Sequence, residues 1–310
     1  MRIVSLLPSL TELICDLGRR DDLVGVTHEC DFPPGVDALP HLTRTRIPHA
    51  ATGAEIDALV AAQGGSLYDL DDARLASLRP DLILTQSQCD VCAVNERTVR
   101  EVAAGLPGSP RVESVNPLDL AGVFAMFRRV GELLGSREAA EGLVSRFERL
   151  AAEIARRRAG LTPPRVALLE WLDPPYRSGH WNPEIVGLAG GVEVLAKAGE
   201  PSSRVSWAEV AAAGPEVLLL APCGFGLERG RVELAGLSRV EEWPTLPAVA
   251  DGRVALIDGS SYFARPGPRL SESLGIAAAA IDAGRCGDLA TGIGWEVIGV
   301  GGGSPIDRFG

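Results

Sequence analysis

The sequence predicts an α/β protein with two Rossmann-like lobes, each built on a parallel sheet, joined by a long backbone α-helix. Two observations support this prediction. Short apolar runs rich in β-branched residues alternate with helical patterns, which is typical of βαβ units and parallel sheets. The same order of elements also restarts after residue 160. Residues 72–84 align with residues 207–219, and in each segment a proline, Pro80 or Pro215, ends a helix just before a buried strand.

The first α/β lobe is expected over residues 1–117. Its opening strand, residues 2–7, ends at Pro8 and Ser9. The helix that follows over residues 10–17 stops at Gly18, a residue suited to a helix C-terminus. The same alternation predicts strands at 23–26, 81–85 and 112–115 and a helix at 72–78.

A helical linker is expected over residues 118–160. One helix covers residues 118–134; after Gly135, Ser136 is placed to cap a second helix that runs to about Arg158. The second helix carries one apolar stripe at spacings of four and three, made of Ala139, Leu143, Phe147, Leu150 and Ile154. At 1.5 Å per residue, about 22 residues span roughly 33 Å, so this helix is long enough to connect two lobes as one stiff rod.

The second α/β lobe is expected over residues 161–284, where residues 165–170 repeat the opening strand of the chain. Beyond this lobe the chain becomes rich in glycine, most clearly at residues 299–304. We therefore expect residues 285–310 to form a tail.

Composition and missing motifs exclude several classes of protein. The net charge is −11 and Lys197 is the only lysine, so the chain lacks the clustered cations that bind nucleic acid. No run of 18 apolar residues occurs and the first residues lack the pattern of a signal peptide, so we expect a cytoplasmic protein without membrane insertion. No Walker A loop, nucleophile elbow or His-Glu-x-x-His motif occurs, and nothing in the sequence specifies an enzyme.

Residues able to bind a ligand gather after predicted strands, at the edge where parallel sheets carry their binding loops. The four loops are residues 27–33, 86–92, 171–181 and 260–265, and they combine aromatic, histidine and cysteine side chains. A second interpretation stays open, in which Trp171 and Trp181 are core anchors and the cysteines are small buried apolar residues.

These segments together resemble the helical-backbone (class III) substrate-binding proteins of ABC importers, especially the vitamin B12-binding branch. The resemblance runs in order over roughly residues 1–282. It rests on Leu-Pro-Ser-Leu-Thr-Glu-Leu at 7–13, Val-Gly-Val-Thr-His-Glu-Cys-Asp-Phe-Pro at 24–33, Leu-Arg-Pro-Asp-Leu-Ile at 78–83, Pro-Pro-Tyr-Arg-Ser-Gly at 174–179 and Tyr-Phe-Ala-Arg at 262–265.

The resemblance implies a non-catalytic, monomeric protein that holds cobalamin, a related corrinoid or another metal chelate in a cleft between the lobes. Tyrosine and tryptophan offer a flat apolar surface with a polar tip, and Arg265 offers a fork for a carboxylate, amide or phosphate oxygen unless it forms a surface salt bridge. The residues expected to bind the ligand are Pro8, Ser9, His28, Glu29, Gln86, Trp171, Tyr176, His180, Trp181, Tyr262 and Arg265.

The sequence departs from the family pattern in three ways. The family members are exported, whereas no leader is seen here. Family glutamates that dock on the transporter permease are replaced by Ala73 and Ala208, with Asp72 and Glu209 beside them, so docking on a permease in the usual form is in doubt. A tryptophan of the B12 importers is replaced by Gln86.

Four potential metal ligands lie in two loops of the first lobe. His28 and Cys30 share one loop, and Cys89 and Cys92 share another at Cys-x-x-Cys spacing, which lets one metal bind both sulfurs. Three interpretations stay open: a Zn²⁺ or iron–sulfur site, coordination of the metal of a bound chelate, and reduced structural thiols. The alternative function is therefore a metal–thiolate or thiol-redox protein, and a third hypothesis is a structural partner for other proteins.

Overall fold

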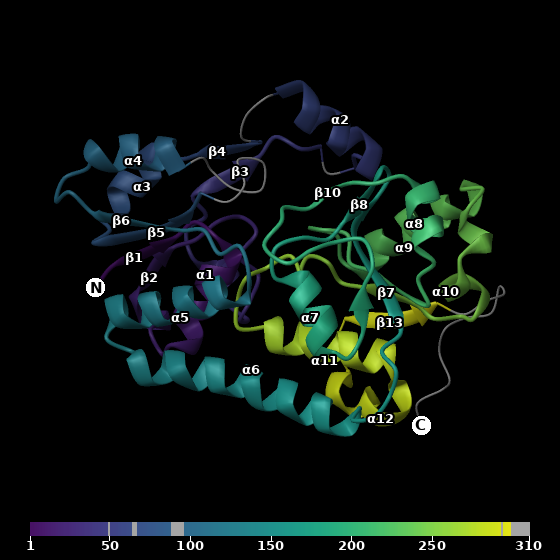
Figure 1. Ribbon diagram of the computed structural model, residues 1–310. Helices are drawn as coiled ribbons and strands as arrows, with labels where there is room; N and C mark the ends of the chain where they lie inside the picture. The colour runs from purple at the N-terminus through teal and green to yellow at the C-terminus, as the bar shows by residue number, and fades with distance from the viewer. Residues whose placement is uncertain (49, 64–66, 88–95, 293, 299–310) are drawn as a thin grey trace. The chain divides into compact units, whose positions relative to one another are not determined.

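The computed structural model describes residues 1–48, 50–63, 67–87, 96–292 and 294–298 (Figure 1). The chain divides into two compact units. Unit 1 comprises residues 1–117 and 121–144, and unit 2 comprises residues 118–120 and the chain from Ser145 onward. Each unit contains its own sheet with helices packed on it, so the predicted α/β class is confirmed.

The main sheet of unit 1 is parallel throughout, as predicted. Its first strand lies centrally, with Ile3 opposite both Leu23 and Leu82. The strand order is β2-β1-β5-β6, with the bounds β1 (Ile3–Ser5), β2 (Leu23–Gly25), β5 (Leu82–Gln86) and β6 (Arg111–Val115). A separate antiparallel ladder, which the sequence analysis did not predict, pairs β3 (Thr43–Thr45) with β4 (Tyr68–Leu70).

The helices of unit 1 begin and end at residues that explain their bounds. In α1 (Pro8–Asp16) proline occupies the first turn, where its missing N–H costs nothing, and Gly18 follows the end with φ 74°. Asp71 caps α3 (Asp72–Leu78) by accepting from Arg74 N at 2.9 Å. The remaining helices are α2 (Gly53–Gln63), α4 (Glu96–Ala104), α5 (Leu120–Leu134) and the 3₁₀ turns η1 (Arg20–Asp22) and η2 (Val36–Ala38).

The two predicted linker helices are α5 and α6 (Arg137–Arg157). They are separated as predicted at Gly135, which has φ 70°. Unit 1 ends at Val144, so α6 contributes residues to both units. The apolar stripe of α6 is buried at Leu143, Phe147 and Ile154, but it begins at Ala140 rather than at the exposed Ala139. Ala140 is buried because it packs against Gly131 of α5, where a Cβ would lie 2.6 Å from the Ala140 Cβ.

The sheet of unit 2 is mixed: its centre is parallel as predicted, and antiparallel strands that the sequence did not predict extend it. Its centre is parallel, with β7 (Arg165–Leu172), β11 (Val217–Leu220) and β12 (Val254–Ile257) side by side, and β9 (Val192–Glu193) also runs parallel to β7. Three strands pair antiparallel with their neighbours because the chain folds back onto the sheet. They are β8 (Pro175–Arg177), β10 (Ser203–Arg204) and β13 (Trp295–Ile298), in the order β10-β8-β7-β11-β12-β13.

The predicted tail is wrong for residues 285–298. After α12 (Ala283–Cys286) and η5 (Gly287–Ala290), β13 pairs with β12. Trp295 Nε1 donates to the carbonyl oxygen of Ala290 at 2.9 Å, and Arg231 pairs with Glu296 at 2.7 Å. The glycines at 299–304, which suggested a tail, lie outside the described residues; the strand before them has the short apolar pattern of an edge strand.

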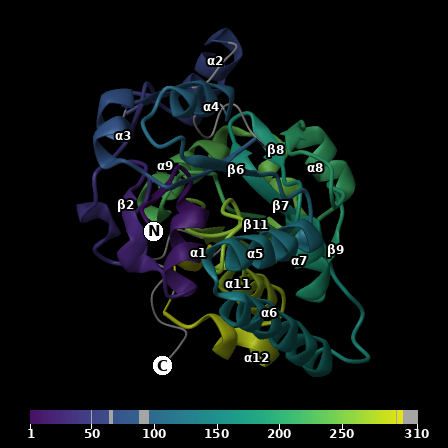
Figure 2. The same cartoon turned by 90° about the vertical axis from the view of Figure 1, so that its left-hand side faces the viewer.

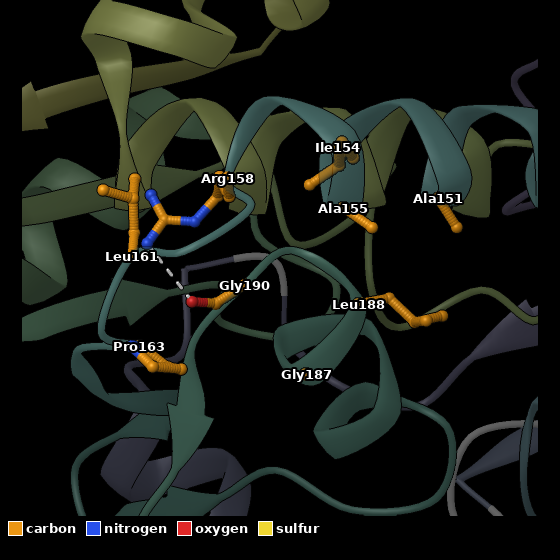
Figure 3. A pocket seen from close by; sticks show the side chains of 9 residues that line it. All are labelled: Ala151, Ile154, Ala155, Arg158, Leu161, Pro163, Gly187, Leu188 and Gly190. Atoms are coloured by element: carbon orange, nitrogen blue, oxygen red, sulfur yellow. Dashed lines mark hydrogen bonds between the residues drawn. The ribbon is translucent and has the colours of Figure 1, made fainter.

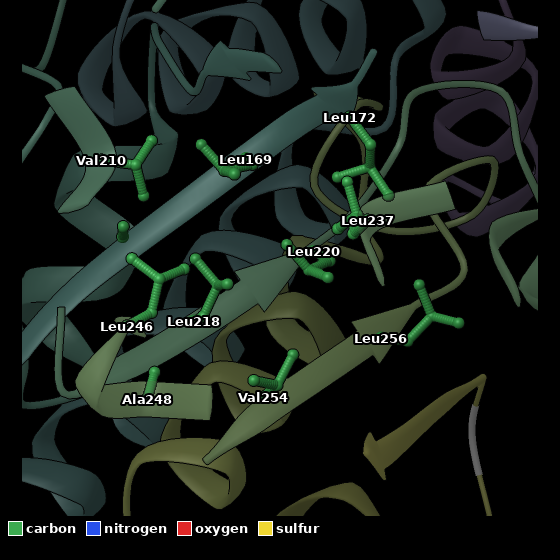
Figure 4. Packing of buried hydrophobic residues seen from close by; sticks show 11 residues of the cluster. Leu169, Leu172, Val210, Leu218, Leu220, Leu237, Leu246, Ala248, Val254 and Leu256 are labelled. Carbon is green, nitrogen blue, oxygen red and sulfur yellow. The ribbon is translucent and has the colours of Figure 1, made fainter. Parts of the chain in front are cut away.

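The core of unit 2 follows from the alternation of side chains along its strands. Leu169, Leu218, Leu220 and Leu256 pack with Val210 on one face (Figure 4). The helical elements in this part of the chain are α8 (Trp207–Ala213), which contains Val210, α9 (Leu227–Gly236), η3 (Leu237–Arg239), η4 (Trp243–Thr245) and α10 (Pro247–Ala250).

The opposite face of this sheet is covered by α7 (Asn182–Leu188) and α11 (Leu270–Ile281), which lie side by side in both views (Figures 1 and 2). Val166, Val186 and Ile281 converge there around Gly191, whose Cα has no room for a side chain. Within the described residues, no helix is long and apolar enough to cross a lipid bilayer.

Candidate ligand-binding site

Two residues of unit 1 lie together at the carboxyl edge of its parallel sheet. Ser9 follows β1 in the first turn of α1, and Gln86 ends the neighbouring strand β5. Ser9 is only 1% exposed, and its hydroxyl has no hydrogen-bond partner among the described groups. Pro8 beside it is buried as well. Buried hydroxyls are usually hydrogen-bonded, so the Ser9 hydroxyl is a group with unused bonding capacity at this edge.

His28 and Glu29 form a small polar cluster with the β3–β4 ladder of unit 1. The Nδ1 of His28 lies 2.6 Å from the hydroxyl of Thr43, and its ring lies 5.3 Å from the ring of Tyr68. Tyr68 donates its hydroxyl proton to Glu29 Oε1 at 2.8 Å. Burial, with His41 nearby, lowers the pKa of His28, so its imidazole is neutral at pH 7. Thr43 and Tyr68 were missed in the sequence because their two strands are only three residues long.

Cys30 lies in a different environment from His28, although the two share a loop. Its sulfur is buried, 3.0 Å from the Thr11 hydroxyl and 3.2 Å from the Thr27 hydroxyl. Cys89 and Cys92, the other two predicted ligands, lie outside the described residues. In the described ranges, no group of three or more His, Cys, Asp or Glu side chains is arranged to hold a metal ion.

Trp171 on β7 and Tyr176 on the neighbouring strand β8 are half-buried, and each contacts a group that the sequence did not point to. The ring of Trp171 lies 4.8 Å from that of Phe225, and the guanidinium of Arg229 lies 3.6 Å above Phe225. Tyr176 on β8 accepts a 2.9 Å hydrogen bond from Arg204 of β10. The signal for Phe225 was present, because Pro-Cys-Gly-Phe directly follows the apolar run that forms β11.

The loop after β8 places His180 and Trp181 in contrasting positions. His180 is half-buried with φ 55°, and burial lowers its pKa. Trp181 is 4% exposed and its indole N–H donates to the carbonyl oxygen of Phe263 at 2.9 Å. Trp181 therefore anchors the loop in the core and leaves little surface for a ligand.

Tyr262 and Arg265 lie in the loop after β12. The loop is shaped by Asp258, whose Oδ1 accepts from Ser260 N at 3.0 Å and from Ser261 N at 3.1 Å. Tyr262 is 8% exposed, with the Arg269 guanidinium 5.5 Å from its ring centroid. Burial raises the pKa of Tyr262, so the phenol is neutral at physiological pH. Arg265 is half-buried.

Glu170 joins several loops at this same edge. Its Oε1 accepts from Asn182 Nδ2 at 2.7 Å and from Gly179 N at 3.4 Å, and its Oε2 accepts from the Ser202 hydroxyl at 2.5 Å. Burial raises the pKa of this carboxyl. No local sequence pattern could have identified this contact set, because Ser202 lies 32 residues away along the chain.

A groove of about 220 Å³ lies elsewhere in unit 2, between the C-terminal half of α6 and the end of α7 (Figure 3). Its wall is mostly apolar and contains none of the predicted ligand residues. Its one charged residue, Arg158, donates to Asp282 Oδ2 at 2.6 Å and to the carbonyl oxygen of Gly190 at 3.4 Å. The charge is thus already matched within the protein.

The acidic residues beside Ala73 and Ala208 have different surroundings. Glu209 belongs to a capping box of α8: it accepts from Ser206 N at 2.7 Å, while its own N–H donates to the Ser206 hydroxyl at 3.2 Å. These hydrogen bonds lower the pKa of Glu209. Asp72 is exposed in the first turn of α3. The Glu209 carboxylate therefore already serves to cap α8.

A sequence model of the periplasmic binding protein family matches residues 3–260. The chain belongs to this family. The vitamin B12-binding protein of Yersinia pestis (strain Pestoides F) is 25% identical over 222 residues, which cover 71% of this chain and 69% of that protein. The resemblance inferred from the motifs is thereby confirmed.

Solved structures of periplasmic binding proteins share the fold. A periplasmic heme-binding protein from Pseudomonas aeruginosa has a TM-score of 0.70 at 21% identity, over 92% of this chain and 93% of that one. The vitamin B12 binding protein of Vibrio cholerae has a TM-score of 0.66 at 19% identity, over 91% and 96%. The heme-binding protein RhuT from Roseiflexus sp. RS-1 has a TM-score of 0.67 at 25% identity, over 91% and 98%. Because the family consists of substrate-binding proteins of ABC transporters, the chain is a binding protein and not an enzyme.

Proposed function

We propose that this protein binds a planar metal chelate of the tetrapyrrole class, a corrinoid such as cobalamin or a heme, for an ABC transporter. The observation that carries this proposal is a set of aromatic rings paired with arginines at the carboxyl edge of the unit 2 sheet. The pairs are Phe225 with Arg229, Tyr176 with Arg204, and Tyr262 with Arg269. The vitamin B12- and heme-binding relatives support the same ligand class.

The chemistry of these pairs suits such a ligand. The half-buried rings of Trp171 and Tyr176 offer a flat apolar surface to a macrocycle. Phe225 and Tyr262 are only 3% and 8% exposed, so their rings support Arg229 and Arg269. Guanidinium groups donate hydrogen bonds to oxygens at the rim of a macrocycle. A heme carries carboxylates and a corrinoid carries mainly amides; both accept from arginine, and the carboxylates add a charge-assisted bond. Cobalamin thus remains one of two ligand types that this surface fits.

Within unit 1 taken by itself, His28 has the chemistry of a residue that coordinates a chelated metal. Its imidazole is neutral at pH 7, and the Thr43 hydroxyl holds Nδ1, as second-shell partners of metal-binding histidines do. When Nδ1–H donates to Thr43, the Nε2 lone pair is free to bind a metal.

The proposal is tested by titrating the purified protein with hemin and with cyanocobalamin and recording visible absorption spectra. We expect a saturable one-to-one change with at least one of them, and an altered spectrum of the bound chelate in His28→Ala. His41→Ala is the matched control, because that histidine lies beside the same cluster and should leave the bound spectrum unchanged. Absence of a saturable change with both chelates would contradict the proposed ligand class.

A further inference from the structure

Glu170 lies at an irregularity in the unit 2 sheet. It lies on β7 between Leu169 and Trp171, where the pairing with β8 shifts its register. Its carbonyl oxygen accepts from Cys223 N at 2.9 Å, in the loop after β11. A register shift of this kind re-aims a side chain, and such irregularities are frequent beside binding sites.

The carboxylate of Glu170 meets donors from both sides of the His180 loop. Gly179 and Asn182 flank His180 and Trp181, and both donate to Oε1. Ser202, which donates to Oε2, belongs to the neighbouring segment 199–204. All three partners are donors, so the two carboxyl oxygens of Glu170 together accept the whole set.

The backbone of this loop has a conformation that its surroundings must hold. His180 has φ 55°, a left-handed value that non-glycine residues seldom adopt. Its N–H donates to Glu200 O at 2.7 Å, and its carbonyl oxygen accepts from Gly199 N at 3.0 Å. A Cβ on Gly179 would lie 2.3 Å from Ser202 N, so the two segments are in close contact here.

Hydrogen bonds also link the His180–Trp181 loop to the loop after β12. Trp181 Nε1 donates to Phe263 O at 2.9 Å, and Phe263 has a left-handed φ of 65°. The Phe263 N–H in turn donates to the Ser273 hydroxyl of α11 at 3.0 Å. The position of Tyr262, directly before Phe263, therefore depends on the same chain of hydrogen bonds.

The charged side chains near Glu170 form their hydrogen bonds with other groups. Arg177 on β8 donates to the Ser203 hydroxyl at 2.7 Å and to Leu195 O at 2.8 Å. The carboxyl group of Glu193 on β9 accepts backbone N–H groups of its own segment and of Leu168 on β7. Over the part of the chain that the structure describes, no ion pair reaches Glu170. The Glu170 side chain is thus held in place by hydrogen bonds and not by a cation.

We propose that Glu170 is a positioning residue, whose carboxylate fixes the His180–Trp181 loop and, through Trp181, the Tyr262 loop in the conformation that meets the ligand. The proposal rests on the proposed chelate-binding function for its ligand. Preorganised loops lower the cost of ordering on binding, so the expected effect falls on the dissociation rate more than on the association rate.

The test compares Glu170→Ala, Glu170→Gln and Ser202→Ala with wild type. The first readout is hydrogen–deuterium exchange of the His180 and Gly199 amides in the unliganded protein. The second is the dissociation rate of whichever chelate, hemin or cyanocobalamin, the wild type binds. We expect Glu170→Ala to raise both by about tenfold, since three donors lose their acceptor.

The conservative variant separates positioning from a general loss of stability. In Glu170→Gln the amide oxygen still accepts from Asn182, and the amide nitrogen donates to the Ser202 hydroxyl. Both readouts should therefore stay near wild type. Glu184→Ala is the matched control, because its carboxylate accepts from Leu120 N at 2.8 Å, in a distant part of the chain; it should leave both amides unchanged.

Two outcomes overturn this proposal: unchanged exchange and dissociation in Glu170→Ala, or a Gln variant as impaired as the Ala variant. If Glu170→Ala does not fold, Ser202→Ala decides. It should raise the same two readouts by about threefold, as the loss of one hydrogen bond implies, and wild-type values would refute the role. If the wild type binds neither chelate, the proposed function fails, while the exchange data still decide the role of Glu170.

Discussion

The indole N–H of Trp181 donates a 2.9 Å hydrogen bond to the carbonyl oxygen of Phe263 and so joins two loops that lie 82 residues apart in the chain. A non-glycine residue with positive φ occurs at each end of this contact: φ is 55° at His180 and 65° at Phe263. Such residues cost roughly 1–2 kcal/mol each and persist where the surrounding structure holds them. This hydrogen bond is therefore a structural tie between two loops that carry candidate ligand residues.

Replacing Trp181 by phenylalanine keeps an aromatic ring but removes the donor to Phe263. The carbonyl oxygen is then buried without its partner, and part of the ring volume is lost. We expect a decrease of about 2–4 kcal/mol in the free energy of unfolding, measured by urea denaturation. Trp171→Phe is the control, because Trp171 is half-buried, and it should lose less than about 1 kcal/mol. Equal losses in the two variants would contradict this account.

Glu193 should make stability depend on pH. Burial raises its pKa to about 7, although backbone N–H groups of Leu195 and Leu168 lower it. Because the folded pKa lies above the ordinary value of 4.5, the contribution to stability is complete below pH 4.5 and is lost as pH rises through 7. The expected loss is at most about 3 kcal/mol.

The measurement is urea denaturation at pH 5 and pH 7.5 for wild type and Glu193→Gln. Glutamine does not titrate, so the variant should have the smaller difference between the two pH values. A difference as large in the variant as in wild type would show that Glu193 is not the group responsible.

Arg158 and Asp282 form an ion pair in which the side chains are only 8% and 14% exposed. Arg158→Met removes the buried partner of Asp282 and leaves only the exposed Arg285, 3.5 Å from the same oxygen, so we expect a loss of about 3 kcal/mol in the free energy of unfolding. Arg97→Met, which breaks the exposed pair with Glu101, should cost less than about 0.5 kcal/mol. The prediction fails if the two variants lose similar amounts in the same denaturation experiment.

The thiols of the first lobe are expected to be reduced and without metal. The Cys30 sulfur contacts two threonine hydroxyls inside a small apolar cluster. Elemental analysis of protein purified without chelator should therefore find zinc and iron well below one ion per chain. Stoichiometric metal in the wild type, lost in a Cys89→Ser/Cys92→Ser double variant, would contradict this expectation and favour a metal–thiolate site.

Much of the fold could be predicted because the central strands leave a strong local signal. The buried runs that form β1, β5, β7 and β11 are each preceded or followed by a helix with a clear stop, such as Pro80 before β5. Edge strands leave little signal: β8 has three residues, and β10 has two. Their pairing depends on how the chain folds back, so the mixed character of the sheet could not be read locally.

In the candidate site, too, local features could be predicted and long-range contacts could not. The loops that follow predicted strands were found because a parallel sheet places its loops at one edge. The contacts that shape those loops were not, because they join distant residues: Glu170 with Ser202, and Tyr68 with Glu29. The sequence predicted Trp181 as a ligand contact, yet its ring is buried and its indole N–H donates to Phe263 O.

The aromatic–arginine pairs of unit 2 are the proposed binding surface for a tetrapyrrole chelate. The most direct measurement is the dissociation constant of hemin and of cyanocobalamin for wild type, Tyr262→Ala, Arg269→Ala and the exposed control Arg285→Ala, from absorption titrations. We expect the wild type and Arg285→Ala to bind alike, and Tyr262→Ala and Arg269→Ala to bind at least about tenfold more weakly, as the loss of one good contact implies. Equal affinity in all four proteins would contradict the claim.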